Sequence, residues 1–246
     1  IGTVTHPPTS ALSATSGTFS TTLDVTGDTT VGGTIQVGVD GTTAGVIRFM
    51  DSGSVTEEAT ISSDANGGLI FGGNSGPGEL IFKTNSGTEH MRINAIGAVT
   101  KPLQPAFHVN KGGTDVSNIA ANGSYSLITW STERFDQNAD FDLTNNRFVA
   151  PVTGKYNLQV QIRLENLDSA AGYYILKLAT SNEDYICLFD PDFGQDAVYW
   201  GMTINVLADM DASDTVNVSI IQSSGTQQTD IDGDAHYTFF SGYLVA

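Results

Sequence analysis

The side chains that most clearly could do chemistry are three carboxylates at alternate positions, Asp230, Asp232 and Asp234. Alternate residues of an extended segment project to the same side. Hard oxygen ligands at that spacing suit Ca²⁺, which takes about 6–8 of them. The segment is not a full EF-hand loop, because no Glu follows at the twelfth position. We expect either a Ca²⁺ site or a solvated acidic loop here, and no other cofactor is required.

The remaining reactive residues do not form a catalytic pattern. The four His residues are scattered, none at a metal-binding spacing from another, and no Gly-x-Ser-x-Gly turn occurs. Cys187 lies in the apolar run 185–189, which favours a buried, inert thiol. Paired carboxylates can hydrolyse glycans, but such enzymes usually need a deep groove on a long rigid scaffold, which this short chain does not supply. We therefore predict a protein that is not an enzyme.

Composition narrows the class of protein further. The chain has 246 residues, with 27 Asp and Glu against 10 Lys and Arg, for a formal net charge of −17. Phosphate binding needs clustered Lys and Arg, so nucleic acid is excluded, and anionic membrane surfaces are equally disfavoured. No apolar run approaches the roughly 20 residues that span a bilayer. No window shows helical apolar spacing, so the sequence predicts an all-β protein.

Residues 1–100 are rich in Gly and Thr and carry short apolar pieces between turn signals, such as 23–25, 46–49 and 69–71. Each piece has one or two large side chains, too few for a core within one chain. Three copies wound about one axis could bury them against one another, giving a thin intertwined trimeric β shaft. A disordered linker is the alternative, and the aromatic Phe71 and Phe82 argue against it.

The segment 78–93, with Glu89-His90-Met91-Arg92-Ile93 at its end, resembles a segment common in phage tail fibres, although His90 stands where that family often has Arg. Residues 22–34 are similar to fibre shaft repeats. The resemblance implies a virion protein that acts outside the cell. Because the first residue is Ile rather than Met, we expect an upstream segment, and tail or baseplate proteins to bind on that side. Pro102 and Pro105 break any strand ladder, so residues 101–105 are predicted to be a neck.

The third region, 106–246, has a different texture, with longer alternating apolar strands and many aromatic residues. Alternation is clearest in 155–165, 197–207, 215–221 and 238–246. About eight such strands separated by Asp, Gly and Ser loops predict a β-sandwich of the jelly-roll type.

The same region resembles the globular head of the complement q subunit, which shares a jelly roll with the tumour necrosis factor family. The resemblance rests on Trp130, Asp136, Phe141, Phe148, Gly154-Lys155-Tyr156, residues 212–216 and Phe240-Ser241-Gly242-Tyr243-Leu244. Trp130 replaces a Phe of the family pattern, and Ser213 stands where the family prefers Gly. The resemblance implies a homotrimer but says little about the ligand, because this fold hosts many partners.

A second argument for a trimer comes from the two-sided strands. Strands 197–207 and 238–246 carry large side chains on both faces, and one face would expose aromatic rings unless another subunit covered it. The candidate interface residues are Tyr199, Phe239 and Tyr243 in this region and Phe82 in the shaft. The alternative is that these are ordinary edge residues.

Strand direction predicts where a ligand could bind. If the chain both enters and ends at the base, the loops 166–172, 190–196 and 222–235 lie at the opposite tip. Exposed aromatic residues beside polar loops often contact sugars or proteins. The candidate contact residues are Phe193, Asp192, Tyr173, Gln227 and Gln228. The alternative for Phe193 is that its ring folds back onto the sandwich.

The function predicted from these features is that of a bacteriophage tail fibre whose knob contacts a host surface glycan or protein. Three identical tips would give avidity, since later contacts become intramolecular. Two alternatives are a capsid or neck decoration fibre without a dedicated receptor, and a secreted lectin-like module. The latter would call for a collagen-like or signal-bearing start, and the sequence shows no Gly-X-Y period.

Overall fold

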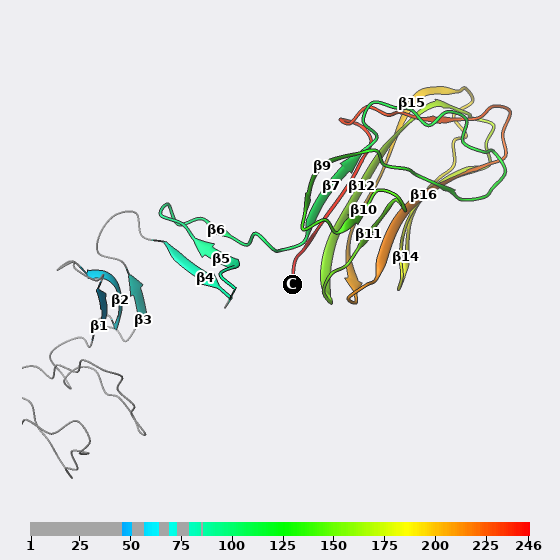
Figure 1. Ribbon diagram of the computed structural model, residues 1–246. Helices are drawn as coiled ribbons and strands as arrows, with labels where there is room; N and C mark the ends of the chain where they lie inside the picture. Colours follow the sequence, from blue (N-terminus) through cyan, green and yellow to red (C-terminus); the bar gives the residue numbers. More distant parts are fainter. Residues whose placement is uncertain (1–45, 51–56, 64–68, 73–78, 85) are drawn as a thin grey trace, which may run out of the picture. The chain divides into compact units, whose positions relative to one another are not determined.

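The computed structural model describes residues 46–50, 57–63, 69–72, 79–84 and 86–246, and every regular element in these ranges is a β-strand (Figure 1). The chain separates into two compact units, residues 1–76 and 77–246. The predicted shaft repeat at 22–34 lies outside the described residues. The division into shaft, neck and knob at 100 and 106 stays a prediction. Nowhere in the described ranges is there a helix with the length and hydropathy of a membrane crossing.

Two small antiparallel sheets precede the large domain. The first has the order β1-β2-β3, formed by β1 (Val46–Met50), β2 (Glu57–Ser63) and β3 (Leu69–Gly72). The second, called the stem sheet below, has the order β4-β5-β6, formed by β4 (Leu80–Lys83), β5 (Glu89–Ile93) and β6 (Val99–Thr100). Each element is short, as expected from apolar pieces interrupted by Gly and Asn.

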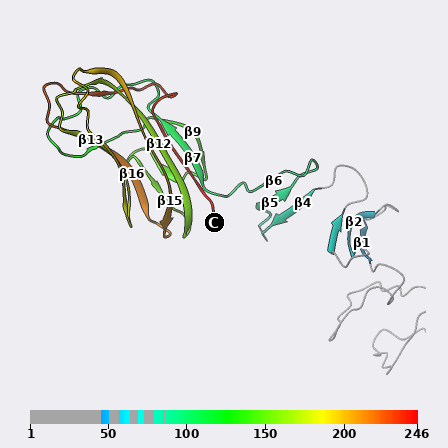
Figure 2. The same ribbon diagram turned by 180° about the vertical axis from the view of Figure 1, so that it is seen from behind.

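The knob consists of two antiparallel sheets that face each other (Figures 1 and 2). The inner sheet has the order β15-β12-β18-β7-β9, with β17 beside β12. Its strands are β7 (Ala106–Asn110), β9 (Thr132–Gln137), β12 (Gly154–Leu167), β15 (Ala197–Met210), β17 (Asp230–Ile231) and β18 (Phe239–Leu244).

The outer sheet has the order β10-β11-β16-β13-β14, with β8 beside β16. Its strands are β8 (Ser126–Leu127), β10 (Phe141–Asp142), β11 (Arg147–Val149), β13 (Tyr173–Thr180), β14 (Asp184–Phe189) and β16 (Thr215–Ser223). Eight of the twelve knob strands have five residues or more, which matches the number predicted. The jelly-roll sandwich is therefore confirmed as the architecture of this region.

Alternation along the longest strands produces the two-faced sheet. In β12 the side chains of Tyr156, Leu158, Val160, Ile162 and Leu164 are all fully buried. The residues between them point outward and are polar or charged, and β12 pairs with β15 in an unbroken antiparallel register. The inward apolar set and the outward polar set thus follow directly from the period of two.

Aromatic rings fill the space between the sheets. Phe107 stacks on Phe148 with centroids 4.6 Å apart and meets the edge of Phe240 at 4.9 Å. Trp130 lies 6.0 Å from Phe240. All four rings are buried. Three of them, Trp130, Phe148 and Phe240, belong to the residues that carry the complement-head resemblance, so that pattern marks the core.

Two glycines of the same pattern lie where no side chain fits. A Cβ on Gly154 would stand 2.5 Å from the carbonyl oxygen of Ala246, and one on Gly242 would stand 2.8 Å from the ring of Phe107. The chain end therefore packs directly against the start of β12. This end of the sandwich, at Gly154, is called the base, and the end of β12 at Leu167 is called the tip.

The neck is fastened to the base by hydrogen bonds. Gln104 Nε2 donates to the carbonyl of Leu244 at 2.6 Å, and the N–H of Leu244 donates to Pro105 O at 3.0 Å. Gln137 Nε2 donates to the carbonyls of Lys101 at 3.0 Å and Gln104 at 2.7 Å. Residues 101–105 hold no strand, as the prolines predict, and the chain enters and ends at the base.

A matched pair of leucines tests this packing. Leu176 on β13 is fully buried, whereas Leu188 on the adjacent β14 is 58% exposed. Leu176→Ala should lower the free energy of unfolding by about 2–5 kcal/mol, because it removes apolar contacts and leaves a cavity. Leu188→Ala should change it by less than about 0.5 kcal/mol. Urea denaturation of both variants checks this, and equal losses would contradict the assigned faces.

Candidate functional site

The three loops predicted to lie at the tip do come together. Gln227 Nε2 donates to Asn166 O and to Asp196 Oδ2, both at 3.2 Å. The N–H and hydroxyl of Ser169 donate to Asp196 Oδ1 at 2.9 and 2.7 Å. These bonds join segments 166–172, 190–196 and 222–235, so the predicted grouping of loops is confirmed.

A buried carboxylate organises this tip. Asp168 is fully buried, and its oxygens accept N–H groups from Gln227 at 2.8 Å, from Ala170 at 2.9 Å and from Thr226. Burial alone would raise the pKa of Asp168, but these hydrogen bonds outweigh it and hold the pKa below its ordinary value. Asp168 is therefore an anion that fixes the position of the 224–228 loop.

Neutral polar groups extend this arrangement into the core. Tyr174 Oη lies 2.6 Å from Thr229 Oγ1 and accepts the N–H of Asp168 at 3.1 Å. Gln222 Oε1 accepts the N–H of Thr229 at 2.9 Å, and its Nε2 donates to Gln227 O at 2.7 Å. All of these side chains except Gln227 are buried. Since unpaired buried polar groups are costly, this network specifies one loop conformation.

Phe193 stands in an aromatic row at the edge of the sandwich. Its ring lies 5.0 Å from that of Trp200 and 6.4 Å from that of Phe189, which in turn stacks on buried Tyr174 at 5.1 Å. Phe193 is 42% exposed and Trp200 is 37% exposed. The ring thus rests against the sandwich, which agrees with the alternative reading, and still offers one side to solvent.

The other candidate contact residues differ in their surroundings. Asp192 is exposed, and Tyr173 is half-buried. Gln228 is exposed, and its Nε2 donates to Asn118 O at 3.4 Å and to Ile119 O at 3.3 Å. Gln227 and Gln228 therefore brace loops in this structure, and whether any of the five candidates meets a receptor stays a prediction.

The three alternate carboxylates are engaged separately. Asp230 accepts the N–H of Asn118 at 2.6 Å, Asp232 is buried in an ion pair with Arg163, and Asp234 accepts the N–H of His236 at 2.8 Å. In the part of the chain that the structure describes, no group of three His, Cys, Asp or Glu side chains could hold a metal ion. Ca²⁺ binding at Asp230, Asp232 and Asp234 stays an untested prediction.

An arginine between two tyrosines is a feature that the sequence did not reveal. The Arg163 guanidinium lies 3.6 Å from the ring centroid of Tyr237 and 4.6 Å from that of Tyr199. It also pairs with Asp232 and, at 3.4 Å, with Glu165. In the sequence, Arg163 is only a positive charge at an outward position of an alternating strand. Tyr199, Tyr237 and Asp232, which surround it, come from distant segments.

The predicted interface residues of the knob share the outward face of the inner sheet. Tyr199 and Tyr243 are 56% and 51% exposed, and Phe239 is half-buried. Phe239 stacks on His108 with centroids 5.2 Å apart, and Phe135 follows at 6.0 Å from His108. This outward face is called the aromatic face below, and its rings lie on β7, β9, β15 and β18.

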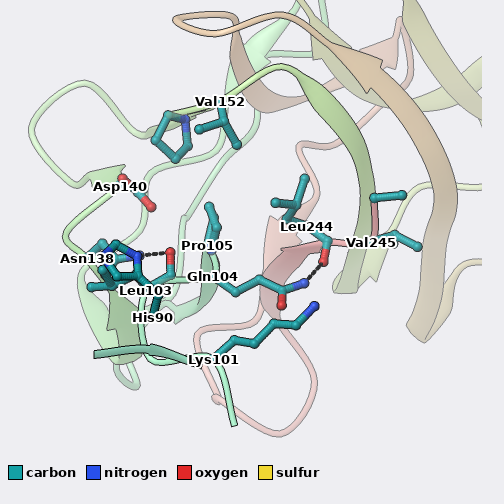
Figure 3. Close-up of a pocket in the computed structure, with 12 residues that line it drawn as sticks. His90, Lys101, Leu103, Gln104, Pro105, Asn138, Asp140, Val152, Leu244 and Val245 are labelled. Atoms are coloured by element: carbon teal, nitrogen blue, oxygen red, sulfur yellow. Dashed lines mark hydrogen bonds between the residues drawn. The ribbon is translucent and has the colours of Figure 1, made fainter. Parts of the chain in front are cut away.

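A cavity of about 710 Å³ opens at the base (Figure 3). Neck and knob residues line it, including Leu103, Pro105, Val152 and Leu244. Asp140 also lines it, where burial raises the pKa of its carboxyl, the charge of Asp136 adds to the rise, and Asn138 opposes it. Nothing in the sequence indicated this cavity, because its walls come from five separate segments of the chain.

Comparison with known proteins leaves the function open. No family model matches the sequence, and no curated protein matches it. Among solved structures, the globular domain of zebrafish complement 1qA is 17% identical over 58% of this chain and 98% of that domain, with a TM-score of 0.41. Murine APRIL at pH 8.0 is 11% identical over 58% of this chain and 99% of its own, with a TM-score of 0.42. At such identities no ligand or activity passes from those proteins to this one.

Asp168→Asn tests the role of the buried carboxylate. An amide cannot accept every N–H that the carboxylate accepts, so we expect a loss of about 1–3 kcal/mol of stability at pH 7. Because the folded pKa of Asp168 is lowered, its contribution is present above the unfolded pKa of about 4 and is lost as the pH falls through the folded value.

The variant should therefore differ from the unmodified chain at pH 7 and approach it near pH 2, in urea denaturation at both values. The exposed Asp192→Asn is the matched control and should change stability little. A loss that is the same at both pH values would contradict the assignment of Asp168 as a structural anion.

Proposed function

We propose that this chain is a non-enzymatic, homotrimeric fibre protein of a bacteriophage tail, whose knob binds a glycan or protein on the host surface. The resemblance of the 78–93 segment to tail fibres supports the viral setting. The trimer is supported by apolar surfaces that one chain leaves uncovered. The position of the tip loops, opposite the neck, supports a contact made at the far end of the knob.

The observation that carries the proposal is the stem sheet. Phe82 pairs with Met91, Leu80 with Ile93, and Ile93 with Val99, so these five apolar side chains share one face. Phe82 is 46% exposed and Val99 is 57% exposed. Among the described residues from 79 to 104, none is buried. A sheet of this size needs its apolar face covered to be stable in water.

The opposite face of the stem sheet is suited to solvent. Arg92 pairs with Ile81 and Thr100 across the strands, and its guanidinium forms ion pairs with Glu79 and Glu89. Two further copies of the chain, each turning its apolar face to a common axis, would cover all three apolar faces and leave the ionic faces in water. Three-fold symmetry is one of the closed arrangements common in oligomers.

The knob also has an apolar surface that is left exposed, and it is larger than that of the stem sheet. The two knob sheets cover each other on the sides that face the core. The aromatic face, on the outward side of the inner sheet, exposes Tyr199, Tyr243 and Phe135. Burial lowers the pKa of His108, and Arg134 lowers it further, so the His108 ring beside Phe239 is neutral at neutral pH. The rings of Phe135, His108 and Phe239 thus form an uncharged aromatic patch within this face, which favours a protein interface.

The tip would then be presented three times at the end of the fibre. Asp190, Asp192 and Asp196 are exposed in the same loop as Phe193, and their charge favours neutral or basic host groups over anionic ones. A capsid or neck decoration fibre would share the trimer but lack the host contact. Location on the particle and competition for adsorption distinguish the two.

The stem interface is tested by placing a charge on each face of the stem sheet. Phe82→Asp should weaken the trimer at least about tenfold, because it forfeits the burial of a Phe, worth roughly 1.5–3 kcal/mol. Thr100→Asp, on the opposite face, is the control and should leave the trimer intact. Light scattering of both variants over a range of concentrations measures this, and equal effects would count against the apolar face as the interface.

The host contact is tested with the free chain as a competitor. The unmodified chain should block adsorption of the virus, and Phe193→Ala should block roughly tenfold less well, as expected for an aromatic contact residue. Leu188→Ala, which removes an exposed side chain from the outer sheet, should block as well as the unmodified chain.

Gold-labelled antibody against the knob, viewed on virions, completes the test. Label at the tail tip is expected. Label over the capsid, together with no block of adsorption, would replace the receptor-binding proposal with the decoration fibre.

A further inference from the structure

Gly201 occupies an unusual place in the aromatic face. It lies inside β15 and pairs with Arg163 of β12 in a regular antiparallel register without a bulge. Its φ lies outside the left-handed region, and a Cβ built on it would meet no atom within 4 Å. An alanine could therefore stand at this position without meeting any described atom of the single chain.

A glycine at such a position has a cost. In a strand interior it loses about 0.5–1 kcal/mol relative to Ala through backbone entropy, and it has no side chain to pack. Gly154 and Gly242 are explained by atoms of the same chain that a Cβ would strike. No atom of the described residues explains Gly201 in this way, and a glycine in a strand often marks close approach by another molecule.

The surroundings of Gly201 are aromatic rings and one arginine whose charge is already paired. Tyr199, two residues earlier on the same face, is 56% exposed. The neighbouring Arg163 guanidinium is held between Tyr199 and Tyr237 and is neutralised by Asp232 and Glu165. A bare backbone flanked by rings, beside a guanidinium whose charge is already paired, suits a flat apolar group rather than an ion.

We infer that Gly201 is the place where an aromatic side chain of a second copy of this chain packs against β15. The inference rests on the proposed trimer and names one of its contacts. In a cyclic trimer the two surfaces that meet are different parts of the same subunit. The β15 side of one aromatic face would therefore meet the β7–β9 side of the next, which carries Phe135, His108 and Phe239.

A series of side chains at position 201 tests the inference. Gly201→Trp should raise the trimer dissociation constant at least tenfold, and Gly201→Ala should raise it by a smaller factor. Ile186→Trp is the matched control, because Ile186 is 53% exposed on β14 of the outer sheet. It should leave the constant unchanged. Sedimentation of the full chain over a range of concentrations gives each value, and circular dichroism checks that each variant keeps its strands.

The outcomes separate the inference from the proposal on which it rests. If the unmodified chain is a monomer, both the trimer and this contact are wrong. If the unmodified chain is a trimer and both Gly201→Trp and Gly201→Ala associate as tightly as it does, the trimer stands and the proposed contact at Gly201 is wrong. If Gly201→Trp stays trimeric but no longer blocks adsorption, the position faces a host group instead, and the second copy is excluded as its occupant. If Gly201→Trp fails to fold, Gly201→Ala decides, since the single chain accommodates it.

Discussion

Every β-sheet has two faces, and an apolar face must be covered by something. In the knob, the inner sheet covers the outer sheet, and the rings of Phe107, Phe148 and Phe240 fill the space between them. Among the residues that the structure describes, nothing plays this part for the stem sheet or for the aromatic face of the knob. The proposed trimer is the arrangement that covers both kinds of surface with copies of the same chain.

The tip depends on a different interaction, the capture of backbone N–H groups by the buried carboxylate of Asp168. Loops that carry function need a fixed conformation, and here a polar network supplies it instead of a hydrophobic core. The network holds the backbone of Thr226 and Gln227, and Gln227 in turn donates to Asp196 in the loop that carries the exposed ring of Phe193. At the base, hydrogen bonds join the neck to the last strand of the knob. Gln104 donates to Leu244 O, and the N–H of Leu244 donates to Pro105 O.

The alternation of apolar and polar residues along the strands predicted the fold well. Alternate side chains of a strand point to opposite faces, so the face that is buried can be found from the local sequence alone. The predicted strands 155–165, 197–207, 215–221 and 238–246 correspond to β12, β15, β16 and β18. The site was harder to predict, because its contacts join distant segments. Asp168 looks like any loop carboxylate in the sequence, and two of its three N–H donors, Thr226 and Gln227, lie almost sixty residues away. Asp232 shares a sequence pattern with Asp230 and Asp234, yet only Asp232 is buried in an ion pair with Arg163, a residue of β12. Ser213, where the resembling family prefers Gly, adopts a φ of 78°, the region in which glycine is favoured.

The central claim is that apolar faces left uncovered by one chain are covered by two more. Sedimentation equilibrium of the unmodified chain, over a hundredfold range of concentration, tests it most directly. The account predicts a mass three times the 25.9 kDa of the chain. A mass equal to one chain at every concentration would contradict the account, because the stem sheet would then have to be stable with its apolar face in water.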